Sequence, residues 1–372
     1  MTGRGLAVLF SLQRADRLGN GAARRLQAIA DVYVGLGLDI LQVVLSSPHD
    51  ALAKDAMPAS WLRPRIGLTL ETVEAAARYL SRDPSLEMDF TALLGGRTPA
   101  LVHVSDWRLH ALTGLIDVAL SQQGRSPTLF VLDRAEHQPT RYSEFVDWLR
   151  IGRWSHPNAD VVLEDGARDL APETDQAVSE AAMHFCPSAS VLMETTGLVF
   201  HEANLDWLRD GLFWLPPEKR FAVTGPGCDT MFRSQHYQRQ LHSNSDRIQF
   251  FPDPSPDLRD ALLRSCRVVV APPFTATEDP TDWDLATPLA LNKSVVGPSA
   301  SLGSAYGSLR TARAIGHDDP ATFGRAVNMA LQASYMYSAR DRRTRSDLSW
   351  EGRLSKSGLR SALKNRLSTQ AQ

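Results

Sequence analysis

Short apolar runs alternate with amphipathic stretches along the first half of the chain. The runs LAVLFSL, LDILQVVLSS, ALVHVSDW and PTLFVLDR are almost continuously apolar and have the length of buried strands. Helical patterns separate them, the first over 22–35 and another near RLHALTGLIDVALSQQ. Strands that are apolar on both faces and alternate with amphipathic helices are typical of parallel sheets covered on both sides. The pattern therefore predicts an α/β domain with a doubly wound sheet.

The same alternation begins again after Phe185. Strand-like runs occur in SASVLMETTG, RFAVTGPG, DRIQFFPD, CRVVVAPP and KSVVGPSA, and helical patterns occur near NLDWLRDGLFWL and LRDALLRS. We therefore expect two Rossmann-like domains, over 1–185 and 186–340, that face each other across a cleft. Ligands of doubly wound sheets bind beyond the carboxyl ends of the strands, so we expect the cleft to hold the functional site.

The C-terminal segment, 341–372, has a different charge from the rest of the chain. Between 340 and 366 there are nine Lys or Arg residues and three Asp or Glu residues. Leu354, Leu359 and Leu363 recur at roughly helical spacing. The segment is expected to form a helix that packs back on the first domain with a solvated basic face. Such a face also suits an anionic membrane surface.

Composition and charge exclude several classes of protein. The chain has 372 residues, 43% of them hydrophobic, which is enough for two cores, and its net charge of −2 gives no case for nucleic-acid binding. Its three cysteines show no metal or redox spacing, so a reducing compartment is expected. No apolar run approaches the roughly 20 residues that cross a bilayer. We expect a cytoplasmic protein whose only membrane contact is peripheral, at the inner face.

The junction between the first strand and the first helix reads GNGAARR. Gly19, Asn20 and Gly21 allow a sharp turn and a close approach of the backbone to a ligand. A helix N-terminus favours anions, and Arg24 and Arg25 add formal positive charge and forked donors. This junction is therefore a candidate phosphate site, although a tight structural turn explains the glycines equally well.

The ordered set of segments resembles GT-B glycosyltransferases of the retaining family-4 type. The G-x-G-x-x-R loop, GLGLDILQVV, TPALVHVSDW and NADVVLED are similar to the first domain of that family. TGLVFHEANLDWLRDGL, RFAVTGPG, DRIQFFPD and the terminal SDLSWEGRL are similar to the second domain and to the helix that crosses back. The resemblance implies a metal-independent, retaining transfer from a nucleotide-diphosphate sugar, with the donor bound mainly by the second domain. The acceptor, a glycan, a lipid-linked molecule or a protein, is implied for the first domain. No resident cofactor is implied.

Two departures from the family concern the donor site. The Glu-x7-Glu pair of the family is replaced, because registering on LALNKSVVG places Asp279 at the first glutamate and Thr287 at the second. Glu278 lies one residue from the first position. The stretch METTGLVFHEAN also lacks the Arg and Lys that the family uses to clamp the diphosphate. These departures favour an alternative: a non-catalytic GT-B protein acting as a nucleotide-sugar sensor or assembly subunit. A third hypothesis is another nucleotide binder of this fold, such as an epimerase.

The remaining candidates follow predicted strands. His103 and Asp106 end one strand, where they can act as general base or sugar-positioning groups or form a structural hydrogen-bonded pair. Asp133 ends the next strand in the same way. Gly225 and Gly227, in VTGPG, can bring backbone amides to a donor phosphate or form a tight turn. No Asp-x-Asp motif and no His or Cys spacing points to a metal site.

Overall fold

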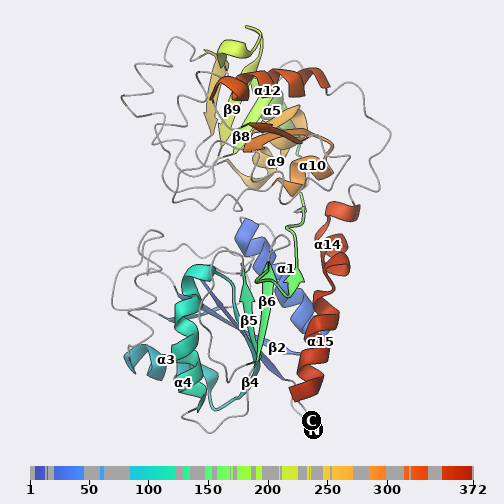
Figure 1. Cartoon of the computed structure of the whole chain (residues 1–372). Coiled ribbons are helices and arrows are strands. Elements are labelled where there is room, and N and C mark those ends of the chain that lie inside the picture. The colour runs from blue at the N-terminus through green and yellow to red at the C-terminus, as the bar shows by residue number, and fades with distance from the viewer. Residues whose placement is uncertain are drawn as a thin grey trace. The chain divides into compact units, whose positions relative to one another are not determined.

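The computed structural model forms two units, Met1–Glu164 with Arg353–Gln372, and Asp165–Gly352. We call them unit 1 and unit 2 (Figure 1). The structure describes residues 5–12, 15, 21–45, 59–62, 84–121, 129–134, 147–152, 157–167, 169–170, 174–185, 190–194, 209, 212–224, 233, 235, 246–251, 254–270, 285–298, 314–317, 320–333 and 346–370.

Unit 1 is built on a seven-stranded sheet in which every described strand pair is parallel. The strand order is β3-β2-β1-β4-β5-β6-β7. The strands are β1 (Leu6–Ser11), β2 (Asp39–Leu45), β3 (Ala59–Leu62), β4 (Pro99–Val104), β5 (Leu129–Asp133), β6 (Trp148–Gly152) and β7 (Val161–Val162). The order changes direction between β1 and β4, which is the point where doubly wound sheets bind ligands.

Helices cover both faces of this sheet (Figure 1). They are α1 (Gly21–Gly35), α3 (Pro84–Leu94), the 3₁₀ helix η1 (Trp107–Leu112), α4 (Thr113–Ser121) and α15 (Leu359–Gln370). Val8 and Phe10 of β1 are buried against α3, η1 and α4, whereas Ala7 and Leu9 are buried against α1 and α15. Both faces of β1 are therefore apolar, as the sequence predicts. Each fully buried large side chain stabilises the sheet by about 1.5–3 kcal/mol.

The C-terminal helix α15 packs on unit 1. Leu359 and Leu363 are fully buried in the same apolar cluster as α1. Arg360 donates to the carbonyl of Gly35 at 2.9 Å, and Arg366 forms an ion pair with Asp147 at 2.6 Å. Helix α14 (Trp350–Ser357) precedes it, and Arg353 of α14 forms an ion pair with Glu164. The end of the chain thus completes the apolar core of its first unit.

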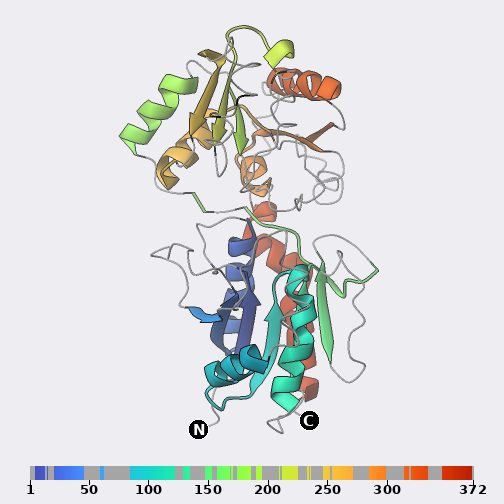
Figure 2. The same cartoon turned by 90° about the vertical axis from the view of Figure 1, so that its left-hand side faces the viewer.

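Unit 2 contains a six-stranded parallel sheet with the order β10-β9-β8-β11-β12-β13. Its strands are β8 (Ser190–Glu194), β9 (Arg220–Thr224), β10 (Ile248–Phe251), β11 (Val268–Val270), β12 (Ser294–Pro298) and β13 (Ala314–His317). Its helices are α5 (Asp175–Phe185), α9 (Pro256–Ser265), α10 (Ala286–Ala290) and α12 (Pro320–Ala333). Figure 2 shows α12 on one side of the sheet and α5 with α9 on the other. The order changes direction between β8 and β11, as it does between β1 and β4 in unit 1.

The division between the units differs from the boundary expected at 185. Unit 2 begins at Asp165, so α5 belongs to it. Ala177 and Ala181 of α5 are buried with Leu192 of β8 and Ala222 of β9. A helix between two groups of strands can cover either sheet, and only this packing shows which one it covers. The C-terminal division also differs, because 341–352 belongs to unit 2 and Arg353 is where the chain returns to unit 1.

We predict that Gly166→Ala destabilises unit 2 by about 1–3 kcal/mol, because overpacking forces neighbouring groups to move. Ala167 forms a parallel bridge with Ser349, which brings Gly166 against Trp350. A methyl group at Gly166 would lie 2.6–2.7 Å from Cδ2, Cγ and Cα of Trp350, and the Cα cannot move without shifting the backbone.

Thermal unfolding of the purified variant measures this effect. Gly114→Ala is the matched control, since Gly114 lies in α4 with no neighbouring atom within 4 Å of its added methyl group. The control should be neutral or stabilising, because alanine favours helix. Equal melting temperatures for the two variants would contradict the prediction.

Candidate functional site

The carboxyl ends of β1, β4 and β5 meet the N-terminal turns of α1 in unit 1. This is the edge of the sheet at its switch point, where ligands of such sheets bind. A cavity of about 20 Å³ lies there, lined by Leu12, Ala22, Arg25, Leu26, Ser105, Asp106, Asp133 and Arg134. Its volume suits about one water molecule. The sequence predicts this edge as the functional region, and the structure brings Arg25, Asp106 and Asp133 together in it.

Arg25 forms the central ion pair of this edge. Its Nε and Nη2 donate to the two carboxylate oxygens of Asp133, each at 2.7 Å. Its Nη1 donates to the carbonyl of Leu163 at 2.6 Å. The side chain is 1% exposed. Arg25 thereby joins α1 to the ends of β5 and β7, and its forked donors are used within the protein rather than directed at a ligand.

Asp133 is ionised in this environment. Burial alone would raise its pKa, but the charge and hydrogen bonds of Arg25 outweigh burial and lower the pKa to about 2. The carboxylate also accepts the backbone N–H of Arg134 at 2.9 Å. An aspartate with so low a pKa is a poor general base near neutral pH. Asp133 fixes the end of β5 through its ion pair with Arg25, and its predicted catalytic role stays a prediction.

Arg134 has a left-handed backbone conformation, with φ of 56°. Such a conformation is uncommon for a residue other than glycine and often occurs at functional sites. The side chain is fully buried and lines the cavity. Its charge helps to lower the pKa of both Asp106 and Asp133. Arg134 was not among the residues predicted from the sequence, and the signal for it is a basic residue directly after a buried strand in VLDR.

Asp106 caps the N-terminus of the 3₁₀ helix η1. Its carboxylate accepts the backbone N–H of Arg108 at 2.9 Å and forms an ion pair with the Arg108 guanidinium at 2.6 Å. Burial opposes its ionisation, but the hydrogen bond from Arg108 and the charge of Arg134 lower its pKa. Asp106 is therefore a helix cap and an ion-pair partner at the cavity wall. Arg108 was also missed, although it lies two residues from Asp106.

His103 lies in the core rather than beside Asp106. Its Nδ1 is 2.9 Å from the hydroxyl of Tyr33 in α1, and the side chain is fully buried. Burial lowers its pKa to about 4, so the ring is neutral at physiological pH. The expected pairing of His103 with Asp106 is not what the structure shows: His103 lies within β4 and contacts Tyr33, whereas Asp106 lies beyond the end of the strand and caps η1. A role for His103 in catalysis stays a prediction.

The N-terminal turn of α1 is described from Gly21 onward. Arg24 is buried at this turn. The predicted residues Gly19 and Asn20 lie outside the described part of the chain, and their role in phosphate binding stays a prediction. Among the described side chains, the edge carries four arginines and two aspartates: Arg24, Arg25, Arg108, Arg134, Asp106 and Asp133. Each of these four arginines also interacts with other groups of the protein.

The corresponding edge of unit 2 is described only in part. Thr287 lies in α10 and is buried. Gly225, Gly227, Glu278 and Asp279 lie outside the described residues, so their predicted contacts with a donor stay predictions. Lys293 donates to the carbonyls of Arg264 and Cys266, the latter at 2.8 Å. Lys293 directly precedes β12, so it fixes the end of α9 at the opposite edge of the sheet, where the strands begin.

Within the described parts of both units, no group of three or more His, Cys, Asp or Glu side chains is arranged to hold a metal ion. No helix among those residues is long and apolar enough to span a bilayer.

Two parallel sheets, each with a Rossmann-type strand order and helices on both faces, define the GT-B fold of glycosyltransferases, and the chain has this fold. The sequence itself matches no protein-family model and no curated protein. The structure is similar to that of HepE from Anabaena in complex with UDP-glucose, with a TM-score of 0.56 and 13% identity over 98% of this chain and 99% of that one.

Two further solved structures are similar over nearly the whole chain. A glycosyltransferase from Rickettsia africae has a TM-score of 0.59 and 13% identity, with 95% of this chain and 96% of that one covered. The lipopolysaccharide outer core galactosyltransferase WaaB has a TM-score of 0.58 and 10% identity, covering 96% of this chain and all of that one. At these identities the likeness shows the fold, which hosts several chemistries.

Proposed function

We propose that the protein is a glycosyltransferase that moves a sugar from a nucleotide-diphosphate sugar to an acceptor, without a metal ion and with retention of the anomeric configuration. The fold supports this proposal over the full length of the chain. HepE, which has the same fold, was crystallised with UDP-glucose and with UDP and glucose. Retention and metal independence rest on the sequence resemblance to the retaining family-4 type.

The observation that carries the proposal is the charged edge of unit 1. Arg25 and Arg134 line the cavity at this edge together with Asp106 and Asp133. A glycosyl transfer that releases a nucleoside diphosphate develops negative charge on its leaving group, and fixed cations stabilise such charge. We assign this role on unit 1 to Arg134, because it lines the cavity and has the left-handed backbone that often marks functional sites. The donor nucleotide is assigned to unit 2 and the acceptor to unit 1.

The alternative is a non-catalytic GT-B protein that senses a nucleotide sugar or serves as an assembly subunit. Thr287 stands at the place of the second glutamate of the family motif, and a hydroxyl cannot accept the two charge-assisted hydrogen bonds that a carboxylate can. This substitution weakens donor binding in unit 2, so turnover and binding have to be measured separately.

A first experiment measures the melting temperature with UDP, GDP, CMP and the common sugar nucleotides, without added metal. A donor at 100 times its dissociation constant should stabilise the protein by about 2.7 kcal/mol. Inorganic diphosphate is the control for a purely ionic effect. Product nucleotide is then assayed with whichever donor binds.

The two hypotheses give different results in this experiment. Binding with turnover supports the enzyme, and Arg134→Gln should then lower kcat at least tenfold, since a charge-assisted interaction contributes about 1.5–3 kcal/mol. Arg150→Gln is the control, because Arg150 forms a half-exposed ion pair with Asp160. Binding without turnover supports the sensor. No response to any nucleotide contradicts both.

The membrane contact that the sequence predicts for the basic C-terminal helix stays a prediction. Arg360 and Arg366 of α15 bond to Gly35 and Asp147, so part of the positive charge holds the helix on unit 1. Lys364 is exposed on the same helix and is the residue to test for this contact.

A further inference from the structure

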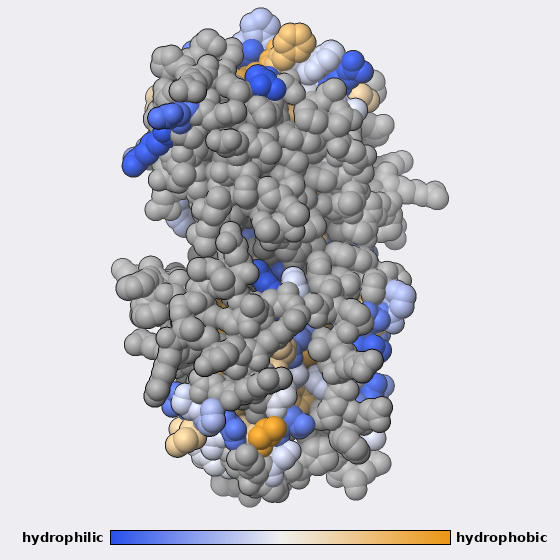
Figure 3. All heavy atoms as spheres, turned by 60° about the vertical axis from the view of Figure 1, so that its left-hand side comes forward, coloured by the Kyte–Doolittle hydropathy of each residue, from blue (hydrophilic) through white to orange (hydrophobic). Residues whose placement is uncertain are grey.

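His110 is a buried polar residue at the charged edge of unit 1. It lies in η1, directly after β4, and is 1% exposed. Figure 3 shows that the described hydrophobic side chains on one face of the molecule lie among hydrophilic ones, and such scattered residues require no function. A buried imidazole is different, because burying its ring nitrogens is unfavourable unless hydrogen bonds compensate. The partner of this ring therefore indicates its role.

The ring of His110 bonds to the backbone at the end of β5. Its Nε2 lies 3.1 Å from the carbonyl oxygen of Asp133. A carbonyl oxygen can only accept a hydrogen bond, so Nε2 carries a proton and donates it. This bond joins the residue that follows β4 by one turn of helix to the last residue of β5.

The peptide group between Asp133 and Arg134 is held at both of its polar atoms. Its carbonyl accepts the hydrogen bond from His110, and its N–H donates to the Asp133 carboxylate at 2.9 Å. That carboxylate is fixed in turn by Arg25, which donates to both of its oxygens at 2.7 Å. Rotation of this peptide would break both bonds, so its orientation is set by the side chains of His110 and Asp133.

This peptide directly precedes the left-handed backbone of Arg134. The φ of Arg134 is 56°, a conformation that a residue other than glycine keeps only where its surroundings hold it. The bonds on the preceding peptide oppose its relaxation to a negative φ. Because φ also sets the direction of the side chain, the same bonds determine where the guanidinium of Arg134 lies.

The helix η1 is a firm support for the ring of His110. Leu109 and Leu112 of η1 are fully buried in the same apolar cluster as Leu132 of β5. At the end of η1, the hydroxyl of Thr113 donates to the carbonyl of His110 at 2.7 Å. The ring therefore cannot follow the peptide at the end of β5 if that peptide turns.

We propose that His110 is a positioning residue that holds Arg134 in its left-handed conformation and so directs the Arg134 side chain to the wall of the cavity. It acts through the peptide between Asp133 and Arg134 and not on a substrate. The effect on catalysis rests on the proposed transferase function, in which Arg134 stabilises the leaving group. The effect on the backbone of Arg134 does not rest on it.

The first test compares crystal structures of the full-length wild-type protein, His110→Leu and His110→Gln. Leucine removes the donor, whereas the amide nitrogen of glutamine lies near the position of Nε2 and donates to the same carbonyl. The φ of Arg134 should be negative in His110→Leu and positive in the other two proteins. His110→Asn, whose shorter amide does not reach the carbonyl, replaces His110→Leu if the leucine variant does not fold. A left-handed Arg134 in the variant without the donor overturns the proposal.

The second test measures kcat with the donor that the protein turns over. His110→Leu should lower kcat about tenfold or more, as Arg134→Gln does, and His110→Gln should restore most of it. The double variant His110→Leu with Arg134→Gln should be no slower than Arg134→Gln alone, because both substitutions remove the same interaction. Losses that multiply in the double variant would show that His110 does not act through Arg134 and would overturn the proposal.

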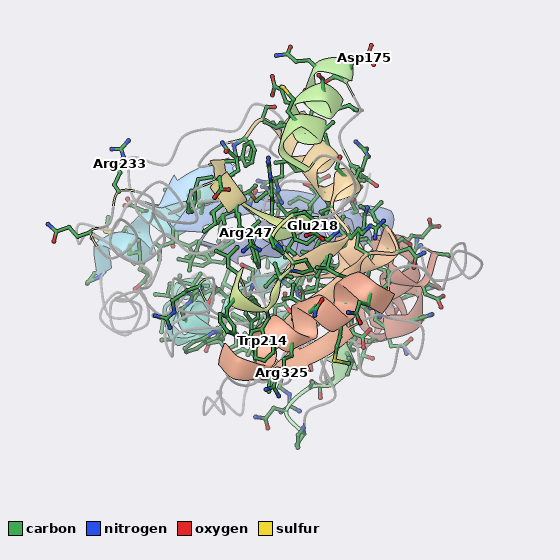
Figure 4. All side chains as sticks on the ribbon, turned by 90° about the horizontal axis from the view of Figure 1, so that it is seen from above. Asp175, Trp214, Glu218, Arg233, Arg247 and Arg325 are labelled. Atoms are coloured by element: carbon green, nitrogen blue, oxygen red, sulfur yellow. The ribbon has the colours of Figure 1, made fainter. Side chains whose placement is uncertain are left out.

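Two control variants separate this effect from a general loss of stability. Thr113→Val removes a hydrogen bond of η1 that does not involve the peptide before Arg134. Arg247→Leu removes donors to the carbonyls of Leu212 and Lys219 in unit 2 (Figure 4), at the end of the sheet where the strands begin. Both variants should melt at a lower temperature and keep the wild-type kcat.

The outcomes distinguish failure of this inference from failure of the proposed function. A Thr113→Val variant that loses as much kcat as His110→Leu assigns the loss to stability and overturns the inference. A wild-type protein that turns over no donor contradicts the transferase, and the φ of Arg134 in the variant structures then decides on its own whether His110 holds this residue.

Discussion

Arg25→Ala is expected to lower the free energy of unfolding of unit 1 by about 3–5 kcal/mol, because it leaves Asp133 as a buried carboxylate without its counter-ion. Both oxygens of Asp133 accept hydrogen bonds from Arg25, and both side chains are 2% exposed or less. The loss also leaves the Leu163 carbonyl without its donor. Equilibrium unfolding in urea, followed by circular dichroism, measures the effect.

The half-exposed pair of Arg150 and Asp160 is the matched control. It has similar geometry, with a distance of 2.9 Å, but its side chains are 33% and 29% exposed. Arg150→Ala should therefore lower the stability by less than about 1 kcal/mol. Replacing both members of the buried pair, by Arg25→Met with Asp133→Leu, should recover most of the loss, because an apolar pair has no charge to desolvate. Similar losses for Arg25→Ala and Arg150→Ala would show that burial of the charge is not the cause.

The doubly wound organisation was predictable because apolar periodicity determines which segments are buried. The run LAVLFSL is buried on both faces as β1, and the expected helix over 22–35 is α1. The expected strand ALVHVSDW is β4, with Asp106 just beyond its end. Local patterns therefore locate the carboxyl edge of the sheet in unit 1 without any tertiary information.

The partners of the charged residues were not predictable in the same way. Arg25 and Asp133 are 108 residues apart, and nothing in either segment identifies the other as its partner. The sequence favours Arg25 as a phosphate ligand because a cation at a helix N-terminus suits an anion, but a buried carboxylate satisfies the same cation. His103 was placed beside Asp106 from their spacing, yet it bonds to Tyr33, 70 residues away. The residue type of Arg134 gives no indication that its backbone is left-handed.

The charged edge of unit 1 bears on the mechanism of the transferase that we propose. Asp133, a buried carboxylate at this edge, forms an ion pair with Arg25 and has a pKa of about 2. General-base catalysis by this residue is therefore unfavourable near neutral pH. For the transferase that we propose, stabilisation of the leaving group by fixed cations therefore fits this edge better than a base on unit 1.

The second large effect is expected in the pH dependence of stability, and it depends on His103. Burial is the main cause of its low pKa of about 4, Arg25 and His110 lower the pKa further, and Asp133 partly opposes them. The ring also contacts the Tyr33 hydroxyl, whose pKa is raised by burial, so Tyr33 stays neutral over the relevant range. In the unfolded chain the histidine pKa is about 6.5.

The direction of this pH dependence follows from proton binding to His103 in the folded and unfolded states. Between pH 6.5 and about 4 the unfolded chain holds a proton on His103 and the folded protein does not, so lowering the pH favours unfolding. The full contribution of His103 to the free energy of unfolding is present above pH 6.5. About 3 kcal/mol of that free energy is lost as the pH falls to about 4. Asp133 stays ionised in the folded protein over this range. Urea unfolding at a series of pH values between 4 and 7.5 measures the slope.

Two variants separate titration of the ring from its hydrogen bond. His103→Gln retains a polar group near Tyr33 but does not titrate, so the stability difference between it and the wild-type protein should shrink by about 3 kcal/mol on going from pH 7 to pH 4. Tyr33→Phe removes the hydroxyl and leaves the histidine buried, so it should keep most of the wild-type slope, because burial is the main cause of the low pKa. A Tyr33→Phe variant that loses the slope would assign the effect to the hydrogen bond instead. A His103→Gln variant with an unchanged slope would show that His103 does not remain neutral and buried in the folded protein.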